Sequence, residues 1–304
     1  MSSNGDAKII VTGAGGWLGT EYLESLLLEM GGKALQSRVV CLGSHERDIT
    51  LSDGTTLEIQ LLSGFKIQTE VEGLVHLAFL TRDKVAQMSA ESYAYANLSI
   101  TSSAIQIIEN LKPRWVATVS SGAIFSTPGG PLENRLSDNP YGFTKRVEET
   151  LLISACESVG ANLAIGRLWG AMGRHMPINR AYAVSDFIEQ AKSTGAIQVR
   201  AEHEVYRRYC LASEFMTVLT QTAAANPFVS FDSGGEVIEL GTLADAISSK
   251  TSAKVLPRRL NSESKVDNYF PKGDTFEQLA KEVGVSLTGL EGQINRTLLS
   301  HGIR

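Results

Sequence analysis

Residues 12–19 read TGAGGWLG, and their glycines follow the spacing G-x-x-G-x-x-G. The preceding run 8–12 (KIIVT) is apolar and rich in β-branched residues, which predicts a buried strand. Residues 17–30 carry large apolar side chains at helical spacing until two glycines interrupt them. A glycine-rich turn between a strand and a helix lets a pyrophosphate approach the backbone and rest on the helix N-terminus. The stretch therefore predicts a dinucleotide site with the cofactor-binding residues Gly13, Gly16, Trp17, Leu18 and Gly19.

The same alternation of strand and helix patterns continues beyond this unit. We predict strands over 38–42, 73–78, 115–120 and 162–168, a hairpin over 48–60, and helices over 89–110 and 141–159. This order is typical of a parallel sheet covered by helices on both faces. The predicted fold class is therefore α/β, a Rossmann-type doubly wound parallel sheet with a smaller C-terminal lobe.

The pattern loosens after about Trp169. Helices are predicted there over 184–193, 211–224, 240–249 and 275–283, and a strand over 196–200. We expect residues 1–168 to form the NAD(P)-binding domain, with part of 205–232 returning to it. Residues 169–304 are expected to form mainly a substrate-binding lobe.

Composition limits the kinds of partner and compartment. The 304 residues carry a formal net charge of −5, which argues against nucleic acid or an anionic membrane as the main partner. The three cysteines are odd in number and far apart, which favours a reducing cytoplasm. The five histidines show no metal-ligand spacing, so no metal is expected. The sequence has no apolar run of the roughly 20 residues that a membrane span needs.

The end of the second predicted strand bears on the cofactor. Dinucleotide sites for NAD usually place Asp or Glu there to bind the ribose 2′-OH. Here the strand runs into Gly43-Ser44-His45-Glu46-Arg47, with no carboxylate at Gly43 or Ser44. Ser44 and Arg47 suit a 2′-phosphate, which favours NADP. NAD stays possible, because Glu46 can reach back or Arg47 can simply be solvated.

Two further segments carry hydroxyl and amino groups that suit catalysis. The strand 115–120 runs into Ser121 at the carboxyl edge of the sheet, where α/β folds bind ligands. Pro140 favours a helix start, which places Tyr141 and Lys145 four residues apart on one face. An ammonium near a phenol lowers the phenol pKa from its usual value near 10. The alternative is a surface pair with no joint role.

These residues together resemble the extended short-chain dehydrogenase/reductase family, the group of NAD(P)-dependent nucleotide-sugar epimerases, dehydratases and reductases. TGAGGWLG matches the family's glycine fingerprint, and His76-Leu77-Ala78 matches its fourth-strand motif. Asn97 matches the helix asparagine, Ser121 with GAIF the catalytic serine segment, and PYGFTK the tyrosine–lysine pair. The resemblance runs over most of the chain.

The resemblance implies hydride transfer at a sugar carbon, most simply C4. Tyr141 would then be the acid/base, Lys145 would lower its pKa and hold the cofactor ribose, and Ser121 would orient the sugar oxygen. Asn97 would support a helix bend and a water relay. The implied catalytic residues are Ser121, Tyr141, Lys145 and Asn97, and Leu77, Ala78, Tyr141 and Lys145 join the cofactor-binding residues.

The implied substrate is a nucleotide-diphosphate sugar. Arg167 opens a segment that usually reads R-x-x-N-x-Y-G-P but here reads RLWGAMGR, with Gly170 in place of the asparagine. Arg207-Arg208-Tyr209 resembles the family's R-D-[FY] segment, whose first arginine grips the diphosphate, although Arg208 replaces the acidic residue. The implied substrate-binding residues are Ser121, Arg167, Arg174 and Arg207.

Several reactions remain open. Ser121 is followed by Gly122-Ala123 and not by the Asp-Glu pair of 4,6-dehydratases, so elimination is not expected. A 4-epimerase and a 4-ketoreductase need the same residues. Two further alternatives are a dinucleotide-binding regulatory protein without chemistry and a reductase of a non-sugar carbonyl. The resemblance also implies a homodimer through the helices 89–110 and 141–159.

Overall fold

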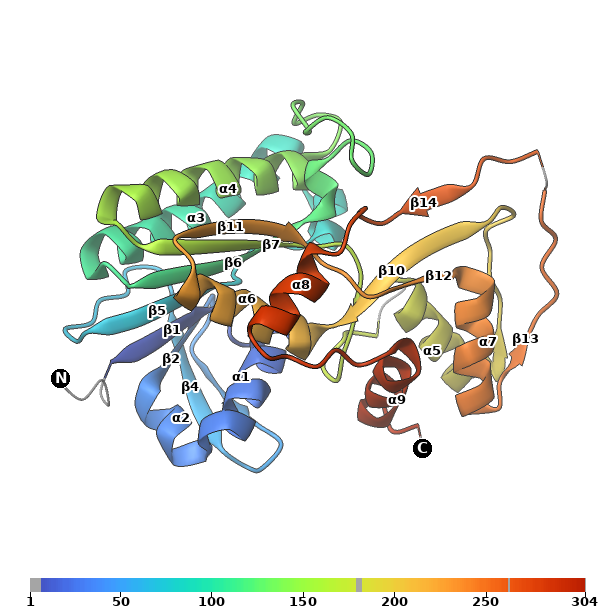
Figure 1. The fold of residues 1–304 in the computed structure, drawn as a ribbon, viewed down its shortest axis with the longest axis horizontal. Helices are drawn as coiled ribbons and strands as arrows, with labels where there is room; N and C mark the ends of the chain where they lie inside the picture. Colours follow the sequence, from blue (N-terminus) through green and yellow to red (C-terminus); the bar gives the residue numbers. More distant parts are fainter. Residues whose placement is uncertain (1–6, 179–181, 262, 304) are drawn as a thin grey trace.

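The computed structural model describes residues 7–178, 182–261 and 263–303. Its centre is an eight-stranded sheet in the order β11-β7-β6-β5-β1-β2-β4-β3 (Figure 1). The strands are β1 (Lys8–Thr12), β2 (Val39–Gly43), β3 (Arg47–Thr50), β4 (Thr56–Leu61), β5 (Val71–His76), β6 (Trp115–Ser121), β7 (Asn162–Leu168) and β11 (Phe228–Asp232). Neighbouring strands are parallel, apart from the β3–β4 hairpin. This sheet confirms the predicted Rossmann-type fold.

Helices cover both faces of the sheet, because buried strands present apolar side chains alternately to each side. Ile9 and Val11 on β1 pack into one core together with α1 (Trp17–Met30), α6 (Ala212–Ala225) and α8 (Thr275–Glu282). Ile10 packs into the opposite core, which α3 (Ala90–Leu111) and α4 (Pro140–Val159) close. Figure 1 shows α3 and α4 side by side on one face of the sheet.

The order of strands reverses between β1 and β5. From β1 the chain proceeds outward through β2 and β4, and it then returns to β5 and proceeds outward on the other side through β6 and β7. Thr12 lies opposite His76 where the two central strands end. In open α/β sheets, ligands bind in the crevice at such a switch point. The fold therefore opens its main crevice where the glycine-rich stretch and the segment after His76 meet.

A second, smaller core lies beside the large sheet. It is built on β8 (Ala171–Met172), β10 (Val205–Leu211), β12 (Glu236–Glu239) and β14 (Asp267–Tyr269), on the pair β9 (Ala196–Ile197) and β13 (Lys254–Val255), and on the helices α5 (Ala183–Thr194), α7 (Leu240–Thr251) and α9 (Leu290–Ser300). Apolar side chains of α5, α7 and α9, such as Phe187, Leu243 and Ile294, fill it. The chain passes between the two cores more than once, since α6, β11 and α8 return to the large sheet. The predicted division of the chain at residue 168 stays a prediction.

Most predicted elements of the first half are confirmed, and the departures have local causes. Gly31, at φ 77°, ends α1 as expected, but a further short helix, α2 (Gly32–Arg38), follows it at once. The strand β5 ends at His76 and not at residue 78, because the amides of Leu77 and Ala78 turn to the hydroxyl of Thr12. The strand expected over 196–200 is limited to Ala196–Ile197.

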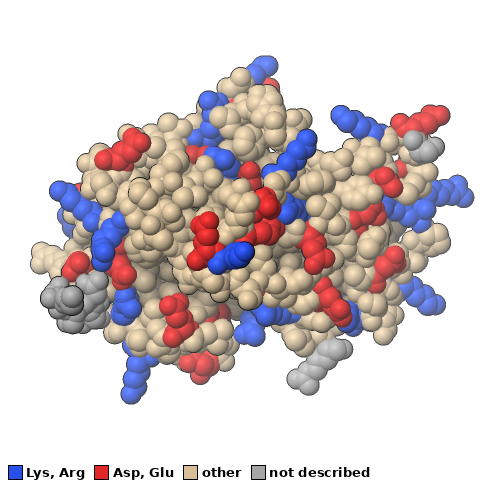
Figure 2. Space-filling model, viewed as in Figure 1, with Lys and Arg blue, Asp and Glu red and all other residues tan. Residues whose placement is uncertain are grey.

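Acidic and basic side chains mix over the surface that Figure 2 shows, without one continuous basic area. No helix among the described residues is long and apolar enough to cross a membrane. The described residues also contain no cluster of three or more His, Cys, Asp or Glu side chains that could hold a metal ion.

Candidate active site

A cavity of about 1710 Å³ lies along the crevice and extends toward the smaller core. Its walls come from the glycine-rich turn, the segments after β2, β5 and β6, the start of α4, and the strands β10 and β14. Thirteen of the residues predicted from the sequence line it: Gly13, Gly16, Trp17, Leu18, Gly19, Ser44, Arg47, Leu77, Ala78, Ser121, Tyr141, Lys145 and Arg207. The fold thus brings the predicted cofactor residues and the predicted reacting groups into one space.

The backbone of the glycine-rich turn lies close to the segment after β5. Gly13 adopts φ 68°, and a Cβ there would lie 2.7 Å from the amide nitrogen of Ala78. Gly16 caps α1 without any side-chain hydrogen bond. Because the first N–H groups of a helix have no intrahelical acceptor, the amides that open α1 remain available to an anion. This cradle fits the diphosphate of a dinucleotide.

The end of the cavity beside β2 carries positive charge. Arg47 Nη2 donates to the carbonyl oxygen of Gly15 at 2.9 Å, so its guanidinium lies over the glycine-rich turn. The Ser44 hydroxyl lies nearby and contacts His45 Nδ1 at 2.8 Å. The lining residues between Gly43 and Ser63 include no carboxylate. No Asp or Glu therefore lies where an NAD site usually has a carboxylate for the ribose 2′-OH, as the sequence predicts.

The start of α4 is tied directly to the end of β6. The Asn139 side chain caps the helix by accepting from the Gly142 amide at 2.9 Å, and it donates to the Ala123 carbonyl at 3.0 Å. A Cβ at Gly142 would lie only 1.9 Å from that carbonyl oxygen, so this close contact requires glycine. The result places Ser121 and Tyr141 on neighbouring walls of the cavity.

The pKa of Tyr141 is raised above its usual value, contrary to the lowering predicted from the sequence. Burial is the main cause, a hydrogen bond with Ser121 opposes it, the negative charge of Glu148 adds to it, and Arg82 opposes it. The sequence argument considered only the Lys145 ammonium and included neither the burial of the phenol nor the nearby Glu148 carboxylate.

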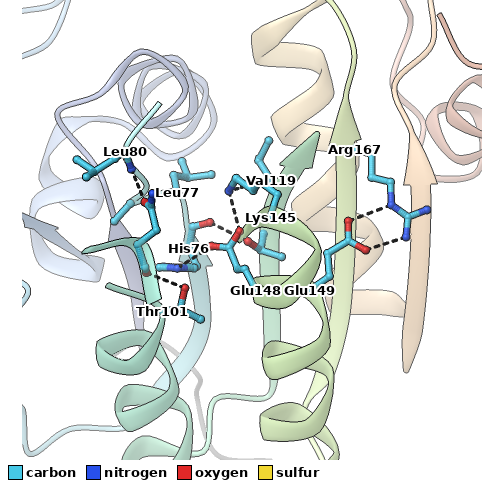
Figure 3. A network of polar contacts seen from close by, with 12 residues as sticks. His76, Leu77, Leu80, Thr101, Val119, Lys145, Glu148, Glu149 and Arg167 are labelled. Carbon is cyan, nitrogen blue, oxygen red and sulfur yellow. Dashed lines mark hydrogen bonds and ion pairs between the residues drawn. The ribbon is translucent and has the colours of Figure 1, made fainter. Parts of the chain in front are cut away.

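Lys145 is buried and already bonded in this structure. Its Nζ donates to the carbonyl oxygen of Val119 at 2.8 Å and to Glu148 Oε2 at 2.7 Å (Figure 3). It also lies 3.7 Å from the ring centroid of Phe79. An ammonium has three protons. Two are used, which leaves one N–H for a ligand in the cavity that Lys145 lines.

Asn97 is buried in α3 and does not line the cavity. Its Oδ1 accepts from the Leu80 amide at 2.7 Å, and its Nδ2 donates to the Tyr93 carbonyl at 3.2 Å. The helix α3 runs without interruption past it. Asn97 therefore ties α3 to the loop after β5, and its predicted catalytic role stays a prediction.

Two of the arginines predicted to bind substrate lie outside the cavity lining. Arg167 pairs bidentately with Glu149, at 3.0 Å from Nε to Oε1 and 2.8 Å from Nη2 to Oε2 (Figure 3). Its guanidinium also lies over the ring of Phe125. Arg174 is exposed and acts on the buried Glu21 of α1, whose pKa burial raises and Arg174 opposes. The structure does not bring either arginine to the cavity wall, and their predicted role in substrate binding stays a prediction.

Arg207 and Arg208 serve different purposes although they are neighbours. Arg207 lines the cavity, pairs with Asp267 at 2.8 Å and lies over the ring of Tyr269. Arg208 points to the other side of β10, where it donates to the Gly235 and Gly273 carbonyls and pairs with Glu277 of α8. The basic residue that departs from the family pattern is thus a structural link between β10 and α8.

Sequence reasoning missed several residues of the cavity. Arg82 opens the short helix η2 (Arg82–Gln87), is exposed, and forms no ion pair with the described residues. Burial raises the pKa of Tyr141, Tyr182 and Tyr269, and the positive charge of Arg82 opposes that rise. Phe79 and Trp169 also line the cavity. Only Phe79 had a usable signal, since it follows the recognised His76-Leu77-Ala78 motif.

The class of protein follows from these features together with sequence comparison. The chain has a dinucleotide cradle at the switch point of a Rossmann sheet and a Ser–Tyr–Lys group on its rim. The NAD dependent epimerase/dehydratase family matches residues 9–229. The chain belongs to this family. No curated relative matches it in sequence.

Solved structures agree with this fold. A UDP-N-acetylglucosamine 4-epimerase from Methanobrevibacter ruminantium M1, in complex with UDP-N-acetylmuramic acid, is similar at TM-score 0.76 and 18% identity, over 97% of this chain and 98% of that one. TunA, an NAD dependent NDP-hexosamine 5,6-dehydratase involved in tunicamycin biosynthesis, reaches 0.74 at 17% identity, over 98% of both chains. A UDP-glucose 4-epimerase from Brucella ovis, in complex with NAD, reaches 0.71 at 15% identity, over 98% of this chain and 99% of that one. At such identities the likeness establishes the fold.

Proposed function

We propose that this protein transfers a hydride at C4 of a nucleotide-activated sugar, as a 4-ketoreductase or a 4-epimerase. The observation that carries the proposal is the single cavity that joins the glycine cradle, the Ser121–Tyr141–Lys145 group and Arg207. When bound, a nicotinamide dinucleotide supplies the hydride or accepts it. Proton transfer, orientation of the sugar and binding of the diphosphate are left to the side chains of the protein.

Each side chain has a task that its position allows. Tyr141 gives a proton to the sugar oxygen or takes one from it, and Ser121 orients that oxygen. Lys145 has one N–H left for a ribose hydroxyl. Arg207, at the opposite wall, suits the diphosphate of the sugar nucleotide, because a guanidinium binds phosphate oxygens in a bidentate manner.

Arg82 is a second cation at the substrate end of the cavity. Unlike Arg207, whose charge Asp267 offsets, Arg82 has no carboxylate partner within the described residues. We propose that it faces an anionic group of the substrate beside Tyr141. Four further points belong to the same proposal: a homodimer through α3 and α4, a cytoplasmic location, no nucleic-acid or membrane partner, and no metal.

The cofactor we propose is NADP, because the β2 end of the cavity carries Arg47 and no carboxylate. Arg47→Ala is expected to weaken NADPH binding about 10-fold or more while changing NADH binding little, since one charge-assisted contact to a phosphate contributes about 1.5–3 kcal/mol. Titration of the purified variant with each dinucleotide measures both dissociation constants. An equal loss for NADPH and NADH would show that Arg47 supports only the glycine-rich turn.

The proposed reaction can be tested with purified protein and a panel of nucleotide sugars and their 4-keto forms. We expect either NADPH-dependent reduction of a 4-keto sugar or interconversion of C4 epimers, followed by NMR of the sugar ring. The same sugars as 1-phosphates, without the nucleotide, are matched controls and should react poorly. Binding of NADPH without turnover across the panel would favour a regulatory protein.

The two reactions differ in how the cofactor is used. An epimerase returns the hydride to the same carbon, so it retains its dinucleotide, whereas a reductase releases the oxidised form after each cycle. The mass of any dinucleotide that co-purifies therefore separates them: tightly held NAD indicates an epimerase, and a site that fills reversibly with NADPH indicates a reductase. The basic β2 end favours the reductase.

A further inference from the structure

A line of buried polar groups runs beneath the cavity from β1 to α4. Glu148 has a side chain only 2% exposed, and its two oxygens face Lys145 at 2.7 Å and His76 Nε2 at 3.3 Å. The His76 ring is fully buried and its Nδ1 lies 2.8 Å from the Thr12 hydroxyl. Figure 3 shows the His76, Glu148 and Lys145 side chains turned toward one another, from β5 and α4.

The contacts around His76 indicate which of its ring nitrogens carries the proton. The Thr12 hydroxyl oxygen accepts from the amides of Leu77 at 3.1 Å and Ala78 at 3.2 Å. The Leu77 amide also donates to the Thr12 carbonyl oxygen at 3.1 Å, so the hydroxyl contacts alone do not decide the tautomer. The Glu148 carboxylate lies 3.3 Å from His76 Nε2, where an unprotonated nitrogen would face a second acceptor, and we therefore assign the Thr12 hydroxyl as the donor to His76 Nδ1. A neutral imidazole whose Nδ1 accepts carries its proton on Nε2. That proton lies on the side of Glu148, although the contact is not aligned as a regular hydrogen bond.

The carboxylate stays charged despite its burial. Burial raises the pKa of Glu148, but the charge of Lys145, the contacts from His76 and the hydrogen bond from Lys145 lower it overall. Lys145 and Glu148 therefore form a neutral pair one turn from Tyr141. At Tyr141, burial raises the pKa most, and the negative charge of Glu148 raises it further.

We propose that Glu148 is a positioning residue, held by His76 and Thr12, which fixes the Lys145 ammonium through one proton and offsets its charge at Tyr141. The same line connects this pair to the cofactor cradle, because Thr12 also holds the amides of Leu77 and Ala78 that line it. The inference rests on the proposed acid/base role of Tyr141, but its main test needs no turnover.

Other ionisable groups also face Tyr141, and the test must separate them. Arg82 approaches from η2, and the phenols of Tyr93, Tyr182 and Tyr269 approach from α3, the start of α5 and β14. The uncharged Ser121 hydroxyl approaches from β6. A change confined to Glu148 leaves all of these in place. Glu149 offers a matched control, since it is also a buried glutamate of α4 but faces Arg167.

The first test compares Glu148→Gln with Glu149→Gln in the ligand-free protein. The phenol carbon of Tyr141, labelled with ¹³C and assigned with Tyr141→Phe, is titrated over the alkaline range in which the fold is retained. We expect the Tyr141 midpoint to fall by about one pH unit in Glu148→Gln, because an uncompensated cation then acts on the phenol. Glu149→Gln should leave it near the parent value. An unchanged midpoint in Glu148→Gln, or the same fall in both variants, would overturn the proposal.

A second measurement uses the unaltered protein and so does not depend on whether a variant folds. The ¹⁵N resonances of His76 should show a neutral ring with Nε2 protonated and Nδ1 accepting. The opposite tautomer, or a doubly protonated ring at neutral pH, would contradict the inferred line of hydrogen bonds. Both measurements are made without substrate, so their failure is distinct from failure of the proposed reaction.

Discussion

Tyr141→Phe is expected to lower turnover by about 10²–10⁴, the usual loss when a general acid or base is removed, with little change in dinucleotide affinity. The variant keeps the ring, and with it the edge-on packing against Phe79 at 6.0 Å between centroids. It removes the hydroxyl that interacts with Ser121. Only the proton-transferring group is lost, so the rate should fall while the fold and the cradle remain.

Turnover of the nucleotide sugar and the dissociation constant of the dinucleotide are measured on the same preparations. Tyr182→Phe is a matched control, because Tyr182 lines the same cavity, its pKa is also raised by burial, and Arg82 also acts on it. Its loss of turnover should be much smaller. If Tyr141→Phe turned over substrate at nearly the parent rate, the phenol would not be the acid/base.

The parts of the fold that follow local rules could be predicted from the sequence. The glycine-rich turn, the helix after it and the Asn139–Pro140 helix start each depend on neighbours within a few residues. Parallel order then follows from the alternation of strands and helices. Tyr141, Ser121 and the cradle were therefore within reach of sequence reasoning.

The polar contacts depend on register between distant strands, which the sequence pattern does not encode. Thr12 and His76 are 64 residues apart and meet only because β1 and β5 pair. Arg207 and Asp267 meet in the same way, across β10 and β14. In the sequence, Glu148 looks like any carboxylate on a helix surface. Only the packing of α4 on the sheet shows that it faces His76 and Lys145. The predicted lowering of the Tyr141 pKa was wrong for this structure because burial of the phenol, and after it the Glu148 charge, raise that pKa.

The arginine predictions show the limit of motif matching. Arg167 stands where the family pattern places it, but Glu149 on the neighbouring helix binds the Nε–Nη2 edge of its guanidinium. Arg208 replaces an acid and instead joins β10 to α8 through Glu277. A motif predicts where an arginine stands in the chain. The side-chain partners of that arginine determine which side of the strand its guanidinium faces.

Lys145→Met is expected to affect stability as well as activity. The change removes the ammonium that Glu148 faces at 2.7 Å and leaves a carboxylate with a 2% exposed side chain. Losing one partner of a buried ion pair costs about 3–5 kcal/mol in the free energy of unfolding. Turnover and dinucleotide affinity should fall too, since the N–H proposed for the ribose is lost. Denaturant unfolding and dinucleotide titration measure these effects separately.

The stability of Lys145→Met should also depend on pH. The contribution of Glu148 to stability should change with pH in the direction opposite to that in the parent. In the parent, the pKa of Glu148 is lowered from its model-compound value of 4.5, so the pair contributes stability above that value and loses it as pH falls. Without Lys145, burial raises that pKa instead. The folded variant then binds a proton more tightly than the unfolded chain, so its deficit is smallest below the unfolded pKa and grows as pH rises through the folded pKa.

The double variant Lys145→Met/Glu148→Gln separates the structural loss from the catalytic one. Because the amide carries no charge to leave unpaired, the second change should restore most of the free energy of unfolding and remove the growth of the deficit as pH rises above the unfolded pKa of Glu148. Only the parent's own loss of stability at low pH should remain in the comparison. Turnover should stay low, since neither change returns a cation to the cavity. If the double variant is as unstable as Lys145→Met, the loss comes from packing around Phe79 and Val119, and the buried carboxylate is not its cause.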